Sequence, residues 1–402
     1  MRYVMALLCL LVGLVSCQPS AEMPTLSITP IESPAANHSA LPSLTTGPAG
    51  QLYLSWVEQE SREDTAFLKF AHLQAEGWSE PLLIAQGNNW FVNWADFPSL
   101  AVSDSFMVGH WLQKSTEGTY DYDVRLAFSY DQGHTWSDSF IAHNDNVSAE
   151  HGFVSMESLP NGQLFAAWLD GRNTKQEGGA MTLHAAIFDQ AGQRLEDWEL
   201  DTRICDCCQT GATLTPSGPL VVYRDRSESE VRDIYQVRWT NEGWTQPQVV
   251  SVDNWQIKGC PVNGPAVSAY GNRVAVAWFT AADDKPTIRA AWSEDQGATY
   301  SRPMQVSRNA PMGRVDVAML ANGYTVVTWV EASETGGKLM LGLWDAAHQP
   351  LGTTVISSVL ATRASGFPKV LALGNRIAVT WTQHTDEVPS VELAWVDILE
   401  GK

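Results

Sequence analysis

The chain has 402 residues, of which 44% are hydrophobic and 17% charged, and its formal net charge is −20. So acidic a chain argues against nucleic acid or an anionic membrane surface as its partner. It contains no Gly-rich phosphate loop, zinc-binding helix motif or dinucleotide fingerprint, so none of the classes that depend on these motifs is indicated.

The amino terminus has the features of a secretory leader. Arg2 precedes an apolar run from Val4 to Val15, which is too short to cross a bilayer as a helix. The run leads into Leu14-Val15-Ser16-Cys17, which resembles the bacterial lipobox and implies cleavage before Cys17 and acylation of that residue. An ordinary secretory signal with an incidental cysteine is the alternative. Gln18 is not the Asp that retains such proteins at the inner membrane, so we expect an outer-membrane anchor in the cell envelope.

A short apolar strand that ends in an aromatic residue recurs along the rest of the chain. The copies end about 50 to 57 residues apart, which suits one four-stranded propeller blade. Their aromatic ends are Trp56, Trp111, Trp168, Tyr223, Trp278, Trp329 and Trp381. The repeat therefore predicts an all-β chain folded as one β-propeller, with seven four-stranded blades as the main expectation and six as the alternative.

The last repeat lacks its outer strand. The earlier repeats each continue into a further strand and turn, whereas the last one stops at Ser390–Trp395. We expect Thr25–Thr29 to supply the missing strand and to pair with residues 390–396, which would join the chain ends and cover a sheet edge. The predicted organisation is a lipoprotein signal peptide over residues 1–16, a lipidated tether with the closing strand over 17–37, and the propeller over 38–402.

Two similar segments, Ser129–Trp136 and Ser293–Tyr300, share the spacing Ser-x-Asp-x-Gly-x-Thr-aromatic, known as the Asp-box. The Asp is expected to accept hydrogen bonds from backbone amides two residues on, while Gly supplies a positive φ, so each box predicts a hairpin turn. The chain thus resembles the sialidase-like β-propellers, which carry such boxes at the outer turns of their blades. The resemblance implies an architecture rather than a chemistry, and seven blades depart from the six that are usual for sialidases.

Propeller geometry brings two sets of loops to one face, around the central channel: the loops that lead into the innermost strands and the loops that follow the second strands. Candidate ligand-binding residues in these loops are Asp96, Asp170, Arg172, Arg224, Asp225, Arg226, Arg314 and Asp316. Because the rigid fork of Arg binds carboxylate or phosphate groups, several Arg on one face predict an anion-binding site. The alternative is that Arg224, Asp225 and Arg226 pair with one another and with Arg232 and Asp233 between blades.

The sialidase resemblance also implies what a catalytic site would contain. Such enzymes hold a substrate carboxylate with three Arg, and use a Tyr–Glu pair as nucleophile and an Asp as acid/base. Their Arg-Ile-Pro segment has no counterpart here, Ala95–Pro98 being the nearest local look-alike. Available groups are Asp96, Glu150, Asp170, Asp316, Tyr120, Tyr122 and Tyr235. None of them lies in a family motif, so no catalytic role is assigned and the question of hydrolysis stays open.

Four cysteines form a second notable pattern. Cys205, Cys207 and Cys208 precede the innermost strand of the fourth repeat, and Cys260 occupies the matching position of the fifth, so their sulfurs could meet at the channel mouth. In an oxidising envelope the favoured interpretation is two disulfides, whose pairing the sequence leaves open. The alternatives are a copper or zinc site, with possible help from His151, and a mixture of one disulfide with a reactive pair.

Two functions fit these features, and the first is favoured. The first is a cell-envelope lipoprotein whose propeller binds, and in one version hydrolyses, an anionic glycan or small anionic ligand. Trp90, Trp94 and Trp255 are its candidates for stacking on a sugar ring, with blade packing as their alternative role. The second is a non-enzymatic envelope protein that holds copper or zinc in the Cys cluster or docks a protein partner. In both, the lipid anchor is the only contact with the membrane.

Overall fold

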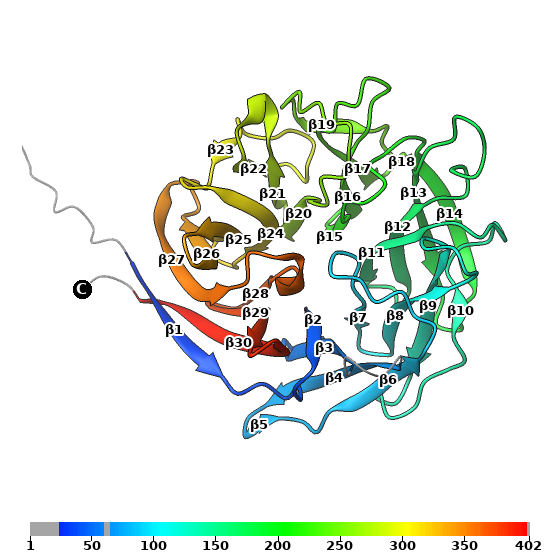
Figure 1. Ribbon diagram of the computed structural model, residues 1–402, viewed down its shortest axis with the longest axis horizontal. Helices are drawn as coiled ribbons and strands as arrows, with labels where there is room; N and C mark the ends of the chain where they lie inside the picture. The colour runs from blue at the N-terminus through cyan, green and yellow to red at the C-terminus, as the bar shows by residue number, and fades with distance from the viewer. Residues whose placement is uncertain (1–23, 60–64, 400–402) are drawn as a thin grey trace, which may run out of the picture.

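A computed structural model describes residues 24–59 and 65–399, and the signal segment and Cys17 lie outside these ranges. Seven antiparallel sheets stand around a common centre, as Figure 1 shows. The seven-bladed propeller predicted from the repeat is therefore confirmed. Within the described residues the helical elements are the single 3-10 turns η1 (Ala282–Asp284) and η2 (Arg363–Ser365), and no helix is long and apolar enough to cross a membrane.

Blades 1 to 7 follow the chain order of their innermost strands, and the strands of each blade are counted from the centre outwards. The innermost strands are β2 (Ser39–Thr46), β7 (Ser99–Val102), β11 (His151–Ser158), β15 (Gly211–Thr215), β20 (Ala266–Tyr270), β24 (Pro311–Met319) and β28 (Lys369–Leu373). The second strands are β3 (Leu52–Glu58), β8 (Met107–Lys114), β12 (Leu164–Asp170), β16 (Gly218–Arg224), β21 (Arg273–Thr280), β25 (Thr325–Ser333) and β29 (Arg376–Thr385).

The outer half of each blade completes the sheet. The third strands are β4 (Ala66–Gln74), β9 (Tyr122–Ser129), β13 (Thr182–Phe188), β17 (Ile234–Thr240), β22 (Thr287–Ser293), β26 (Gly336–Trp344) and β30 (Val388–Leu399). The outermost strands are β5 (Gly77–Trp78), β6 (Leu82–Gly87), β10 (Phe140–Ile141), β14 (Arg194–Asp201), β18 (Gly243–Trp244), β19 (Gln248–Ser251), β23 (Met304–Gln305), β27 (Pro350–Val359) and β1 (Thr25–Ile31).

The recurring tryptophans explain why the second strands repeat so clearly. Trp56, Trp168 and Trp329 are buried between blades, and each donates its indole N–H to the acidic side chain two residues on. In blade 3 this acceptor is Asp170, at 2.9 Å. A buried indole needs such a partner, because its N–H would otherwise lose its hydrogen bond to water. The aromatic residue therefore recurs because it fills a buried position between blades, and in these three blades the acidic residue two positions later accepts its N–H.

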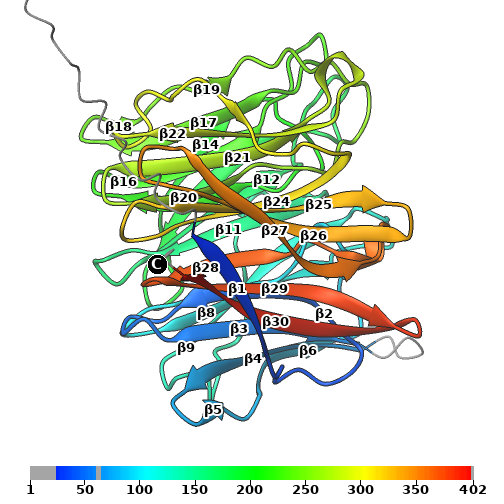
Figure 2. The same cartoon turned by 90° about the vertical axis from the view of Figure 1, so that its left-hand side faces the viewer.

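The ring closes as predicted, with a small difference in register. Strand β1 pairs antiparallel with β30, with Thr25 opposite Leu399 and Ile31 opposite Leu393. The partner segment therefore begins at Leu393 rather than Ser390. Figure 2 shows β1 and β30 side by side. This pairing gives the last blade its fourth strand, so its sheet has no open outer edge at β30.

Both Asp-box segments form tight turns, with one correction to the predicted hydrogen bonding. Asp131 accepts the amide N–H of Thr135, four residues on rather than two, and also the Thr135 hydroxyl at 2.7 Å. Gly133 has φ 87° and lies directly against Phe70 of the preceding blade, where a Cβ atom would come within 2.2 Å of the ring. The box therefore packs one blade against its neighbour.

Candidate functional site

Two adjoining cavities lie on the propeller axis. The channel cavity, of about 190 Å3, is lined by residues from all seven innermost strands, such as Ser43, Ser155 and Lys369. The mouth cavity, of about 310 Å3, is built mainly from loops that lead into those strands. Ala95 and Phe153 line both, so they form the wall between them.

The mouth cavity has aromatic walls and is also lined by an exposed arginine. Phe91, Trp94 and Tyr120 line it, and Tyr120 is 58% exposed. Trp94 stacks on Phe367, with ring centroids 5.6 Å apart, which fixes the plane of the indole. The guanidinium of Arg363 lies 5.8 Å from the Trp94 ring, and among the described residues it forms no ion pair.

A tyrosine joins two carboxyl groups at this wall. The hydroxyl oxygen of Tyr122 lies 2.9 Å from Glu150 Oε1 and 3.2 Å from Asp96 Oδ2, while Asp96 Oδ1 accepts the amide N–H of Phe153 at 2.7 Å. Glu150 lines the mouth cavity and Asp96 the channel cavity. We call Asp96, Tyr122 and Glu150 the carboxyl cluster.

The local backbone explains this close approach. Tyr122 begins β9 and Glu150 immediately precedes β11, and a parallel bridge aligns the two residues. Gly152 faces the cluster, and a Cβ atom there would lie 2.1 Å from Asp96 Oδ2. Only glycine at this position leaves room for the buried carboxyl.

Burial shifts the pKa values of both carboxyls in the same direction. Asp96 is 2% exposed, and burial raises its pKa to about 8. Burial likewise raises the pKa of Glu150 to about 7, although the Tyr122 hydroxyl opposes the shift. Burial raises the pKa of Tyr122 well above its usual value. A carboxyl with a pKa near neutrality can give or take a proton at physiological pH.

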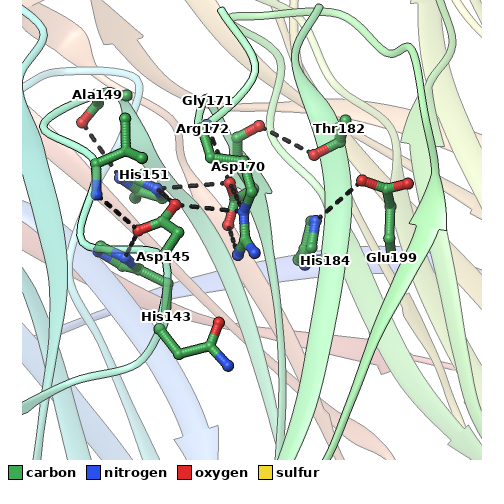
Figure 3. A network of polar contacts seen from close by, with 12 residues as sticks. His143, Asp145, Ala149, His151, Asp170, Gly171, Arg172, Thr182, His184 and Glu199 are labelled. Atoms are coloured by element: carbon green, nitrogen blue, oxygen red, sulfur yellow. Dashed lines mark hydrogen bonds and ion pairs between the residues drawn. The ribbon is translucent and has the colours of Figure 1, made fainter. Parts of the chain in front are cut away.

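His151, the residue after Glu150, belongs to a separate group of charged side chains, which Figure 3 shows. His151 Nε2 lies 2.8 Å from Asp145 Oδ2 and 3.5 Å from Asp170 Oδ1, and its ring stacks on that of His143 at 3.6 Å. Arg172 binds Asp170 through two hydrogen bonds of 2.7 Å. We call these five residues the ion-pair network.

The ion-pair network shifts the pKa values of its carboxyls in the opposite direction. Burial alone would raise the pKa of Asp170, but hydrogen bonds from Arg172 and His151 hold it well below its usual range. Burial also opposes the charged form of His151, yet its carboxylate partners raise its pKa to about 9. Its other ring nitrogen, Nδ1, lies 3.2 Å from the carbonyl oxygen of Ala149, so both nitrogens face acceptors. The charged imidazolium satisfies this geometry.

The other predicted arginines have partners within the protein. Arg224, 1% exposed, donates to the carbonyl oxygens of Asn263, Arg232 and Phe279. Because these acceptors are backbone groups, the predicted alternative of mutual ion pairs does not describe this residue. The guanidinium of Arg224 also lies over the ring of Trp255. Trp255 is buried, so its ring is not available for stacking on a sugar.

Arg226 and Arg314 are engaged in separate places. Arg226 forms ion pairs with Asp206 and Glu230, at 2.9 and 2.8 Å, rather than with its neighbour Asp225. Arg314 donates to the carbonyl oxygen of Thr362 at 2.7 Å and to the Ser365 hydroxyl. Neither cavity on the axis is lined by Arg172, Arg224, Arg226 or Arg314. The structure therefore does not bring these four arginines together around one open site.

The remaining predicted acids, Asp316 and Asp225, do not line the same cavity. Asp316 lines the channel cavity and accepts the amide N–H of Val370 at 2.9 Å. Burial raises the pKa of Asp225 to about 6, with the nearby Asp201 adding to the shift. Of the three candidate stacking tryptophans, Trp94 lines the mouth cavity, whereas Trp90 stacks on Trp111.

The four cysteines form two disulfides, Cys205–Cys208 and Cys207–Cys260. The second joins the loops that lead into blades 4 and 5, and both of its cysteines line the mouth cavity. Sulfurs that are bonded to each other offer no thiolate to copper or zinc. His151 is held by carboxylates rather than by the cysteines.

Sequence reasoning named Tyr122 and Glu150 only as available groups, placed Arg363 in a loop of the functional face without assigning it to the ligand site, and did not name His143 or Asp145. The one local signal for Glu150 is its position directly before an innermost strand. The contact between Tyr122 and Asp96 joins residues 26 positions apart in neighbouring loops, which no single-sequence pattern displays.

Comparison with known proteins identifies the fold but no family. No protein-family model matches the chain, and neither does any curated protein. The polysaccharide lyase Uly1 is similar, with a TM-score of 0.54 and 8% identity over 90% of each chain. A protein of unknown function from Dyadobacter fermentans has a TM-score of 0.51 and 12% identity over 93% of this chain and 99% of its own. At such low identity these similarities show a shared propeller fold.

Proposed function

We propose that the mouth cavity binds a glycan, with a sugar ring packed against Trp94 and Tyr120. The observation that carries this proposal is a cavity with aromatic walls that is also lined by Glu150, a carboxyl whose pKa burial raises to about 7. Aromatic faces bind the apolar faces of sugar rings, and a few placed polar groups fix their orientation. The shared fold with a polysaccharide lyase is consistent with a glycan ligand.

An acidic sugar fits the charges of this cavity. Arg363 lines it without a carboxylate partner among the described residues, whereas the charge of Asp206 is already met by Arg226. The guanidinium of Arg363 can therefore bind the carboxylate of a uronate or sialate while the ring rests on Trp94. This assigns the anion-binding role to one arginine that sequence reasoning did not single out.

The chemistry that the cavity could support is acid-assisted cleavage of a glycosidic bond. Glu150 and Asp206 both line it, and glycoside hydrolysis requires one protonated and one ionised carboxyl. Glu150, with a pKa near 7, would donate the proton. Asp206, paired with Arg226, would supply the negative charge.

The test is a panel of neutral, uronate-containing and sialylated oligosaccharides, with affinity measured by calorimetry and products by chromatography. We expect an acidic oligosaccharide to bind, and Arg363→Ala to weaken binding by about 1.5–3 kcal/mol, as for a lost charged hydrogen bond. Arg308→Ala is the matched control, because Arg308 is exposed and lines neither cavity. Glu150→Gln should keep binding and lose cleavage. Absence of binding across the panel, or equal losses in both arginine variants, would contradict the proposal.

We also propose that Cys17 is acylated and holds the propeller at the bacterial cell envelope, on the outer membrane. The support is the lipobox-like segment before Cys17, followed by Gln18. Cys17→Ser should move the protein out of the membrane fraction. Palmitate labelling that persists in this variant would show that the assignment is wrong.

A further inference from the structure

The carboxyl cluster contains one hydroxyl between two carboxyl oxygens. Tyr122 Oη lies within hydrogen-bonding distance of both Glu150 Oε1, at 2.9 Å, and Asp96 Oδ2, at 3.2 Å. A tyrosine hydroxyl has one proton to donate and can accept one or two. If both carboxyls were ionised, one of these contacts would be an oxygen facing an oxygen without a proton between them.

Among the described residues no other side chain donates a hydrogen bond to these carboxyls, and the two charged groups nearest Glu150, the cation His151 and the anion Asp206, act on it in opposite directions. The only further hydrogen bond to Asp96 from the described residues is the amide N–H of Phe153, which reaches Oδ1. Two negative charges across one hydroxyl in a buried site repel each other. The contacts are satisfied when one carboxyl is protonated and donates to Tyr122 Oη, while Tyr122 donates to the other. The geometry thus requires one shared proton.

The position of the cluster gives this proton a route. Asp96 lines the channel cavity, and Glu150 lines the mouth cavity on the other side of Ala95 and Phe153. A ligand seated against Trp94 would cover Glu150 from the mouth. Glu150 would then reach solvent through Tyr122, Asp96 and the channel.

We propose that Asp96, Tyr122 and Glu150 form a proton relay that connects the channel cavity to the mouth cavity, so that Asp96 restores the proton that Glu150 gives to a bound ligand. This rests on the proposed function for the identity of the acceptor. In the step, the Tyr122 hydroxyl proton moves to Glu150 Oε1, and the proton on Asp96 Oδ2 moves to Tyr122 Oη. Asp96 becomes a carboxylate and regains a proton from solvent in the channel. One proton is transferred, and no group is oxidised or reduced.

The two carboxyls have similar pKa values, so a proton can pass between them, and the step from Asp96 to Glu150 runs slightly uphill because Asp96 is the weaker acid. Burial raises the pKa of Asp96 to about 8 and that of Glu150 to about 7. Between these values the proton resides mainly on Asp96, the group beside the channel. Asp96 is therefore a proton reserve for Glu150 near neutral pH.

The first test needs no substrate. Infrared difference spectra across pH 5–10 follow the carboxyl C=O stretch in the wild type and in the Asp96→Asn, Tyr122→Phe and Glu150→Gln variants, which assign each band. We expect Tyr122→Phe to raise the midpoint of Glu150 by about one pH unit or more, because its carboxylate loses a hydrogen-bond donor. Tyr120→Phe, which removes a hydroxyl from the same cavity, should leave it unchanged. An identical Glu150 midpoint in wild type and Tyr122→Phe would overturn the relay.

The second test uses a glycan that the wild type cleaves. Asp96→Asn should lower kcat at least tenfold with little change in KM, and small weak acids that fit the channel should restore part of the rate. A parallel loss of kcat in the absence and presence of such acids would assign Asp96 a structural role instead. If the wild type binds a glycan but cleaves none, the proposed cleavage chemistry is wrong, and the infrared result still decides whether the three groups share a proton.

Discussion

Consecutive residues at the start of β11 belong to two buried charge clusters with opposite behaviour. Glu150 lies in the carboxyl cluster, where burial raises the pKa values of the acids. His151 lies in the ion-pair network, where Asp145 and Asp170 are held well below their usual pKa. The two clusters share a strand end and differ in one respect. The network contains Arg172 and a charged His151, whereas no cation among the described residues forms a hydrogen bond or ion pair with the carboxyl cluster.

The comparison shows that the supply of cations, rather than burial, decides the sign of the shift. Asp96 and Asp170 are both almost completely buried, at 2% and 0% exposure. Asp170 has a bidentate arginine, which compensates the cost of desolvating its charge. Asp96 has only neutral donors, so it keeps its proton. We infer that the network stabilises the junction of blades 2 and 3, while the carboxyl cluster is reserved for proton transfer.

The largest expected effect comes from making the same substitution in both clusters. Asp170→Asn removes the charge that Arg172 and His151 require and should lower the free energy of unfolding by about 3–5 kcal/mol at pH 7, as for a broken buried ion pair. Asp96→Asn replaces a protonated carboxyl by a neutral amide of the same shape and should cost far less. Urea denaturation measures both, and equal losses would contradict the distinction.

The pH dependence of stability above about pH 4 should distinguish the two clusters. The native state binds the Asp96 proton more tightly than the unfolded state, so this group contributes stability that falls as pH rises from about 4 towards 8. Asp96→Asn should therefore gain stability relative to the wild type by up to about 1.4 kcal/mol per pH unit in that window. Melting curves at pH 5, 6, 7 and 8 test this. A constant difference between the two proteins would show that Asp96 does not titrate there.

Below about pH 4, the ion-pair network should lose its stabilising contribution. The pKa of Asp170 is lowered by folding, so its stabilising contribution is present above about pH 4 and is lost as pH falls below that value. The stability difference between wild type and Asp170→Asn should therefore shrink below pH 4. A difference that stays constant down to pH 2.5 would mean that the charge of Asp170 contributes nothing.

The smallest effects come from a pair of arginines. Arg172→Ala should lower stability by about 2 kcal/mol, since the side chain is partly exposed, and should leave glycan affinity unchanged. Arg363→Ala should do the reverse, because Arg363 is exposed and forms no ion pair with the described residues. Thermal melts and calorimetry on both variants give the four values, and a reversed pattern would exchange the roles of the two arginines.

The sequence predicts the fold better than the site, because the fold depends on repeated local patterns. The aromatic strand ends and the closing strand Thr25–Thr29 were sufficient for seven blades and their closure. Cysteine spacing favoured disulfides but left their pairing open, since that depends on how two loops meet. Arg224 shows the limit most clearly. Its residue type suggested an anion site, whereas three backbone carbonyls, which no side-chain pattern reveals, accept its hydrogen bonds.

The most direct test of the account is a crystal structure with the acidic oligosaccharide that binds most tightly. We expect a sugar ring against Trp94, its carboxylate on Arg363, and the glycosidic oxygen within hydrogen-bonding distance of Glu150. Such a complex would assign the mouth cavity as the ligand site and the carboxyl cluster as its proton source. A ligand bound instead at Arg172 or Arg226, with the mouth cavity empty of sugar, would contradict it.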